Sequence, residues 1–182
     1  MSKRLNWKTI DMATDADTYV LFELAGGTYA VPSSSVQHIE MLEHVTPVPN
    51  AHRAIDGVVF SRGQVIPALN LRVRFGFPRL ETSMRTRVVF AQINGRVVGL
   101  IVDTAREFKK IPPTSIRPIE RALTGIAGNY LQGLTSVNDR LTLILDLEAV
   151  LNLDKDESLA NSLSEVIAQA TAAGPAVETL AN

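Results

Sequence analysis

The chain has 182 residues, 46% of them hydrophobic and 20% charged, a balance that predicts a globular protein of one domain or two small ones. Eighteen basic and 19 acidic residues leave a formal net charge of −1, so the chain lacks the positive field that draws proteins to nucleic acid or acidic lipid. Cysteine is absent, which excludes disulfides and thiolate metal sites, and the sequence shows neither a leader-like start nor a run of about 18 apolar residues. We therefore expect a cytoplasmic protein; if it works at a membrane, another molecule must hold it there.

The first half of the chain predicts short strands joined by tight turns. Residues 1–17 mix charges with small polar side chains and predict a loose arm. Beyond this arm, a hairpin with its turn at Gly26-Gly27, a single strand and a second hairpin with its turn at Ser61 to Gln64 are expected. The corresponding strands are residues 20–24, 28–31, 36–41, 58–60 and 65–71, and a short helix is expected over residues 71–75.

The second half predicts the same order of elements. Hairpin turns are expected at Asn94-Gly95 and at Asn138-Asp139, between strands at residues 88–93 and 96–102 and at residues 134–137 and 141–146. A helix is expected from Asp146, whose side chain would cap it. Apolar residues at helical spacing then predict a C-terminal amphipathic helix within residues 152–172 that packs on its own chain, followed by a disordered tail at residues 173–182.

The two halves share this order of elements because the sequence contains an internal repeat. The stretch VLFELAGGTYAV at residues 20–31 returns at residues 88–102, and residues 57–71 return at residues 133–147. In the second pair, Gly57 corresponds to Gly133 and Asn70 to Asp146. Such self-similarity indicates two copies of one supersecondary unit, each too small to bury a core alone. We expect two small β units packed face to face, with a groove between them in which a partner binds.

Residues suited to catalysis or metal binding do not converge in the sequence. His38, His44 and His52 are spaced six and eight residues apart, so no two of them share a helical face as a zinc site requires. Three serines after Pro32 lack the flanking glycines of a nucleophile elbow. We predict no metal, no cofactor, no small-molecule substrate and no enzymatic activity.

A basic stretch leaves one alternative open. Five arginines lie within sixteen residues that contain only one acidic residue, and two phenylalanines lie among them, as in the nucleic-acid-binding edge of a small barrel. These arginines are Arg72, Arg74, Arg79, Arg85 and Arg87. The other interpretation is that they form the solvated side of an element whose apolar side is buried.

Several segments in order resemble the CheW family of adaptor proteins, which couple the histidine kinase CheA to chemoreceptors. They are PVPN at residues 47–50, IDGVVFSRGQVIPALNLR at residues 55–72, RVVGLIVDTAREF at residues 96–108 and DRLTLILDLEAVL at residues 139–151. The resemblance spans residues 18–151 and implies a mostly β fold of two SH3-like five-stranded barrels with a groove between them, plus short helices. It places the barrels at residues 18–85 and 86–151, with exchange of terminal elements between them allowed.

The resemblance also implies two partner surfaces. The groove would take the tip of a chemoreceptor's cytoplasmic hairpin, and its matching positions are Val36, His38, Arg62, Gly99 and Phe108. The barrel ends would contact the regulatory domain of a CheA-type kinase through Ile39, Val45 and Arg117. The chain departs from the family's pattern at Pro32 and the serines after it, at Phe60-Ser61, and at Asn70. The resemblance thus implies an adaptor that works at membrane-associated receptor arrays without entering the membrane.

Overall fold

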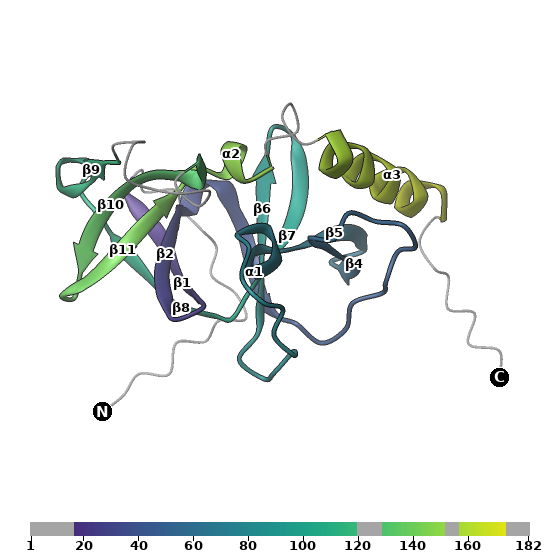
Figure 1. The fold of residues 1–182 in the computed structure, drawn as a ribbon, viewed down its shortest axis with the longest axis horizontal. Coiled ribbons are helices and arrows are strands. Elements are labelled where there is room, and N and C mark those ends of the chain that lie inside the picture. Colours follow the sequence, from purple (N-terminus) through teal and green to yellow (C-terminus); the bar gives the residue numbers. More distant parts are fainter. Residues whose placement is uncertain (1–16, 120–128, 152–156, 174–182) are drawn as a thin grey trace.

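A computed structural model describes residues 17–119, 129–151 and 157–173, which form two β-sheets with a few helices (Figure 1). The six-stranded sheet has the strand order β8 (Thr104–Lys110), β1 (Thr18–Leu24), β2 (Gly27–Pro32), β11 (Arg140–Leu145), β10 (Leu131–Val137) and β9 (Arg117–Pro118). The five-stranded sheet has the order β3 (Val36–Met41), β6 (Arg87–Ile93), β7 (Arg96–Val102), β5 (Gln64–Asn70) and β4 (Ile55–Ser61). The mostly β architecture agrees with the prediction, and β9 makes one sheet larger than expected.

The helices are short except for the last. They are η1 (Ser33–Ser35), α1 (Leu71–Arg74), η2 (Pro113–Ser115), α2 (Leu147–Leu151) and α3 (Glu157–Ala173). Helices α1 and α2 directly follow β5 and β11, at equivalent points of the repeat. Asn70 Oδ1 accepts a hydrogen bond from the Val73 N–H at 3.2 Å, and Asp146 Oδ1 accepts one from the Ala149 N–H at 3.0 Å. The capping role predicted for Asp146 is therefore confirmed.

The internal repeat is visible as two matching sets of strand pairings. Hairpin β1–β2 corresponds to β6–β7, and hairpin β4–β5 corresponds to β10–β11. In each sheet the last strand of one hairpin pairs in parallel with the last strand of the other, β11 with β2 and β5 with β7. Each sheet therefore combines strands from both sides of residue 86, the expected boundary between the two repeats. The first hairpin of each copy lies in the sheet that contains the second hairpin of the other copy.

Three of the four predicted hairpin turns lie where the sequence indicates, and one is shifted. Positive φ values occur at Arg62 and Gly63, at Asn94 and Gly95, and at Asn138 and Asp139, as expected for two-residue hairpin turns. The prediction of a turn at Gly26-Gly27 is wrong by one residue. The turn is Ala25-Gly26, with φ of 50° and 82°, because Leu24 pairs with Gly27. The Ala25 N–H donates to Asp103 Oδ2 at 2.8 Å, which stabilises an unfavourable conformation for alanine.

Alternation along the strands divides the apolar residues into three clusters. One, the intersheet cluster, takes residues from both sheets and therefore lies between them; Phe22 of β1 and Leu100 of β7 belong to it. A second is the inner cluster of the five-stranded sheet, which includes Phe90 and Ile66. The third is the inner cluster of the six-stranded sheet, which includes Leu21. The space between the sheets, where we expected a groove, is thus occupied by packed side chains over much of its extent.

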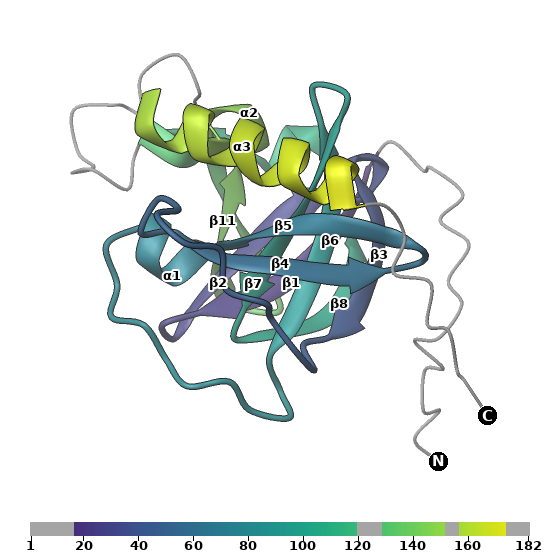
Figure 2. The same cartoon turned by 90° about the vertical axis from the view of Figure 1, so that its right-hand side faces the viewer.

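Helix α3 lies across β5 and β4 on the outside of the five-stranded sheet (Figure 2). Leu159, Leu163 and Val166 are at most 1% exposed, and the two leucines join the intersheet cluster. Ser162 Oγ accepts a hydrogen bond from the His52 N–H at 2.8 Å, which ties the helix to the loop before β4. The helix therefore packs on its own chain, as its apolar spacing predicts. Residues 1–16 of the predicted arm, residues 152–156, and residues 174–182 of the predicted tail lie outside the described residues.

Candidate interaction surfaces

Two of the predicted receptor-binding residues, Val36 and Phe108, meet at the intersheet cluster. Val36 begins β3, is only 5% exposed and is a member of the cluster. Phe108, on β8, is partly buried and packs against the same cluster. Both side chains contribute to packing between the sheets, so a partner would reach Phe108 more readily than Val36.

Gly99 lies inside the five-stranded sheet. A Cβ atom at this position would lie 2.8 Å from Val88 Cγ1 and 3.4 Å from Phe90 Cε1. Close packing of β7 against β6 therefore accounts for the glycine without any partner. Its role in binding a receptor stays a prediction.

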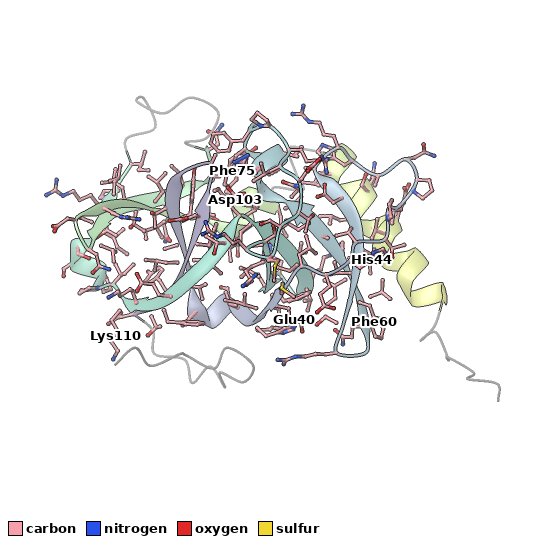
Figure 3. All side chains as sticks on the ribbon, turned by 90° about the horizontal axis from the view of Figure 1, so that it is seen from below. Glu40, His44, Phe60, Phe75, Asp103 and Lys110 are labelled. Carbon is pink, nitrogen blue, oxygen red and sulfur yellow. The ribbon has the colours of Figure 1, made fainter. Side chains whose placement is uncertain are left out.

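Arg62 is exposed at the turn between β4 and β5, next to an aromatic residue that the sequence prediction missed. Phe60, two residues earlier, is 66% exposed and stands at the edge of the molecule (Figure 3). The signal was present in the sequence, because β4 buries every second residue from Ile55 to Ser61 and this alternation turns Phe60 outward. An exposed guanidinium beside an exposed ring gives this turn both polar and apolar binding capacity.

His38, the remaining predicted receptor residue, belongs to a polar cluster that we name the seam cluster, consisting of His38, Glu40 and Ser61. His38 Nε2 lies 2.9 Å from Ser61 Oγ and 3.3 Å from Glu40 Oε1. The Ser61 hydroxyl donates to Glu40 Oε1 at 2.8 Å. The imidazole stacks on Phe90 of β6 with ring centroids 4.4 Å apart.

Burial and a nearby charge both act on the ionisation of His38. Its side chain is 8% exposed, and burial, the larger cause, lowers the pKa because it disfavours the charged imidazolium. The positive charge of Arg62 lowers the pKa further, whereas Glu40 opposes the change by its charge and its hydrogen bond. The net direction is downward, so His38 is neutral at neutral pH.

The three predicted kinase-binding residues lie at separate places. Ile39, on β3, is partly buried against the intersheet cluster, whereas Val45 is partly buried against the inner cluster of the five-stranded sheet. Arg117 is exposed on β9, at the outer edge of the six-stranded sheet. The structure therefore brings no two of them into one patch, and each sheet carries part of the set.

Most of the basic stretch is engaged within the protein. Arg72 Nε donates to Asp103 Oδ1 at 2.8 Å, and Arg79 pairs with Asp56. Arg74 donates to the Val150 carbonyl at 2.8 Å and lies over the ring of Tyr130 at 5.0 Å from its centroid. Arg87 donates to two backbone carbonyls. These contacts give four of the five arginines structural roles, which weakens the nucleic-acid interpretation.

A cavity of about 340 Å³ opens over the six-stranded sheet, and no predicted site residue is part of its lining. Its lining includes Glu23, Glu107 and Arg140, and Arg140 lies 3.8 Å from Glu23. Within the described ranges, no group of histidine and acidic side chains could hold a metal ion. No helix among the described residues is long and apolar enough to cross a membrane.

Comparison with known proteins identifies the family. The protein-family model of the CheW-like domain matches residues 18–155 of the sequence. The chain is 28% identical over 142 residues to the chemotaxis protein CheW of Klebsiella aerogenes, covering 78% of this chain and 86% of that protein. It is 29% identical over 136 residues to the chemotaxis protein CheW of Helicobacter pylori, covering 75% of this chain and 82% of that protein.

A solved structure agrees with these sequence relationships. The scaffolding protein TtCheW from Thermoanaerobacter tengcongensis matches with a TM-score of 0.69 at 26% identity, covering 79% of this chain and 92% of that one. The chain therefore belongs to the CheW-like domain family, a family of chemotaxis scaffold proteins without enzymatic activity. The resemblance seen in the sequence is confirmed. Helix α3 lies beyond the matched residues.

Proposed function

We propose that this chain is an adaptor that couples a CheA-type histidine kinase to the cytoplasmic hairpin tips of chemoreceptors, and that these partners recruit it to receptor arrays at the membrane. The observation that carries the proposal is that the CheW-like domain match spans both sheets, from β1 to the end of α2. Relatives that match this region are named chemotaxis proteins, and the similar solved structure is titled a scaffolding protein.

The proposed receptor surface centres on the turn between β4 and β5. Arg62 and Phe60 are its exposed side chains, and the seam cluster with His38 lies beside them. Phe108 would extend this surface toward the six-stranded sheet. A helical hairpin offers apolar side chains at helical spacing together with polar ones, which an aromatic ring and a guanidinium can both contact. Val36 and Gly99 would affect receptor binding indirectly, because their packing holds β3 and β7 in place.

The proposed kinase contacts come from both sheets and do not form one continuous patch. Arg117 on the edge strand β9 is its exposed residue, and Ile39 and Val45 are its partly buried apolar residues on and after β3. Strands at sheet edges offer unpaired backbone groups to a partner of similar fold. Because Arg117 on β9 and Arg62 on the β4–β5 turn lie in different sheets, a receptor and a kinase would be able to bind at once.

Only substitutions at exposed residues can change partner binding without disturbing the fold. Val36→Asp would place a carboxylate in the core and disturb folding, so it cannot isolate receptor binding. Arg62→Asn removes the guanidinium, and asparagine accepts the φ of 49° at this turn position. Arg117→Ala removes an exposed side chain on β9, and Arg85→Ala, at another exposed arginine, is the matched control.

The experiment measures binding of each variant to a purified receptor cytoplasmic fragment and to a purified kinase regulatory domain by titration calorimetry. We expect Arg62→Asn to raise the receptor Kd about tenfold, about 1.4 kcal/mol, with kinase binding unchanged. Arg117→Ala should have the opposite selectivity, and Arg85→Ala should change neither. Equal losses for both partners in either variant would rule out separate surfaces, and no binding of the parent chain would rule out the adaptor function.

A further inference from the structure

The two edge strands of the five-stranded sheet are joined by side chains. Strands β3 and β4 stand at opposite ends of the strand order, and in the part of the chain that the structure describes they share no ladder. The seam cluster nevertheless connects them, because His38 and Glu40 on β3 contact Ser61 at the end of β4. This side of the sheet is therefore closed by these side-chain contacts and by a backbone bridge between Thr46, after β3, and Val58 of β4.

The hydrogen bonds of the seam cluster fix the tautomer of His38. The Ser61 hydroxyl has one proton and donates it to Glu40, so its oxygen is left to accept from His38 Nε2–H. With the proton on Nε2, the other ring nitrogen, Nδ1, carries a lone pair. Nδ1 is buried and has no hydrogen-bond partner among the residues that the structure describes.

A second proton on His38 would have to bind at this unpartnered Nδ1. A buried N–H without an acceptor is unfavourable, and a buried charge is more so. Three neighbouring elements bear on that charge: Glu40 on the same strand favours it, Arg62 on the β4–β5 turn opposes it, and β6 presents the uncharged ring of Phe90. The closed arrangement therefore tolerates the neutral ring and resists the imidazolium.

We propose that the seam cluster is a proton-sensitive latch between β3 and β4. In mild acid a solvent proton binds Nδ1, and the charged ring leaves its site against Phe90 and loses its bond to Ser61. The end of β4 with the Arg62 turn is then released from β3 and is held by its pairing with β5 alone. The latch is a property of the folded chain that goes beyond its partner binding.

The direction of the pH effect follows from the lowered pKa of His38. The released ring has the ordinary histidine pKa of about 6.5, above that of the closed site, so the open form binds protons first as pH falls. The closed form keeps its full stability above about pH 6.5 and loses it between that pH and the closed-site pKa. Within this window the opening constant rises by up to about tenfold per pH unit.

The test is performed on the full chain by NMR. The pKa of His38 is read from its ring carbon shifts, and amide hydrogen exchange at the end of β4 is followed from pH 7.5 to 5.5 after correction for intrinsic rates. His38→Phe preserves a ring that can stack on Phe90 but cannot titrate, and His44→Gln removes an exposed histidine as the control.

We expect a His38 pKa below 6.5. In the parent and in His44→Gln, protection at Ser61, at the end of the β4–β5 ladder, should fall by up to about tenfold per pH unit below about pH 6.5. Protection in His38→Phe should not depend on pH over this range. A His38 pKa at or above 6.5, or the same pH dependence in His38→Phe, would overturn the proposal. If His38→Phe does not fold, the pKa and the exchange profile of the parent decide the question by themselves.

Discussion

Leu163→Ala on helix α3 tests whether this helix is part of the protein's core. Leu163 is 1% exposed and belongs to the intersheet cluster, together with Leu159 one turn earlier. Replacing a buried leucine with alanine costs about 2–5 kcal/mol, since transfer free energy is lost and a cavity remains. We expect about 3 kcal/mol for Leu163→Ala, in the middle of that range because the site is fully enclosed.

Urea denaturation, followed by far-UV circular dichroism, measures this loss as a change in the free energy of unfolding at constant m-value. Ser164→Ala, at the next, exposed position of the same helix, is the matched control and should lie within about 0.5 kcal/mol of the parent. A loss below 1 kcal/mol for Leu163→Ala would refute the packing argument.

The combined variant Leu159→Ala with Leu163→Ala, compared with a chain lacking residues 154–182, separates a weakened core from a detached helix. If the helix detaches, the combined variant loses no more free energy of unfolding than the truncated chain does. Its loss is then smaller than the sum of the losses of the two single variants. A truncated chain with unchanged stability but lost partner binding would show that the apolar face of α3 serves a partner instead.

Three further outcomes follow from particular contacts. Gly57→Ala should cost at least about 3 kcal/mol in thermal unfolding, because a Cβ would lie 2.0 Å from the Thr46 carbonyl oxygen at a φ of 145°; near-normal stability would show that the Thr46 loop can move away. Asp103→Ala should cost about 3 kcal/mol, since its carboxylate accepts from Arg72 Nε and from the Ala25 N–H, both at 2.8 Å; a loss under 0.5 kcal/mol by urea titration would contradict this bridging role. Labelled single-stranded RNA should bind no tighter than about 10⁻⁴ M by anisotropy at physiological salt, and a tight, salt-steep complex that Arg85→Ala abolishes would revive the nucleic-acid alternative.

Local features of the fold were predictable from sequence, and features that depend on distant pairing were not. Asn94-Gly95 and Asn138-Asp139 mark their turns because two adjacent residues must tolerate positive φ. Strand β8 was missed because it follows β7 after Asp103 without a turn signal, and Glu107 and Lys109 obscure its alternation at a sheet edge. The exchange of hairpins between sheets depends on parallel pairings such as β2 with β11, which a sequence pattern does not reveal.

Family resemblance supplied the candidate surfaces, which stay predictions, and the structure shows which of their residues a partner can reach. Arg62 and Arg117 are exposed as a binding role requires, whereas Val36 is a core residue because side chains fill the space between the sheets. The seam cluster could not be predicted, since His38 and Ser61 are 23 positions apart and meet only when the sheet closes. For the same reason the Arg72–Asp103 pair, 31 positions apart, was not foreseen and the basic stretch looked free.

Simultaneous binding of both partners is the most direct test of the adaptor function. Analytical ultracentrifugation of the full chain with a CheA-type regulatory domain and a chemoreceptor cytoplasmic fragment measures whether one species contains all three. Separate surfaces predict a ternary complex in which the Kd for each partner changes by less than about threefold, about 0.7 kcal/mol, when the other is present. Mutually exclusive binding, in which one partner displaces the other, would contradict the coupling of kinase to receptor through this chain.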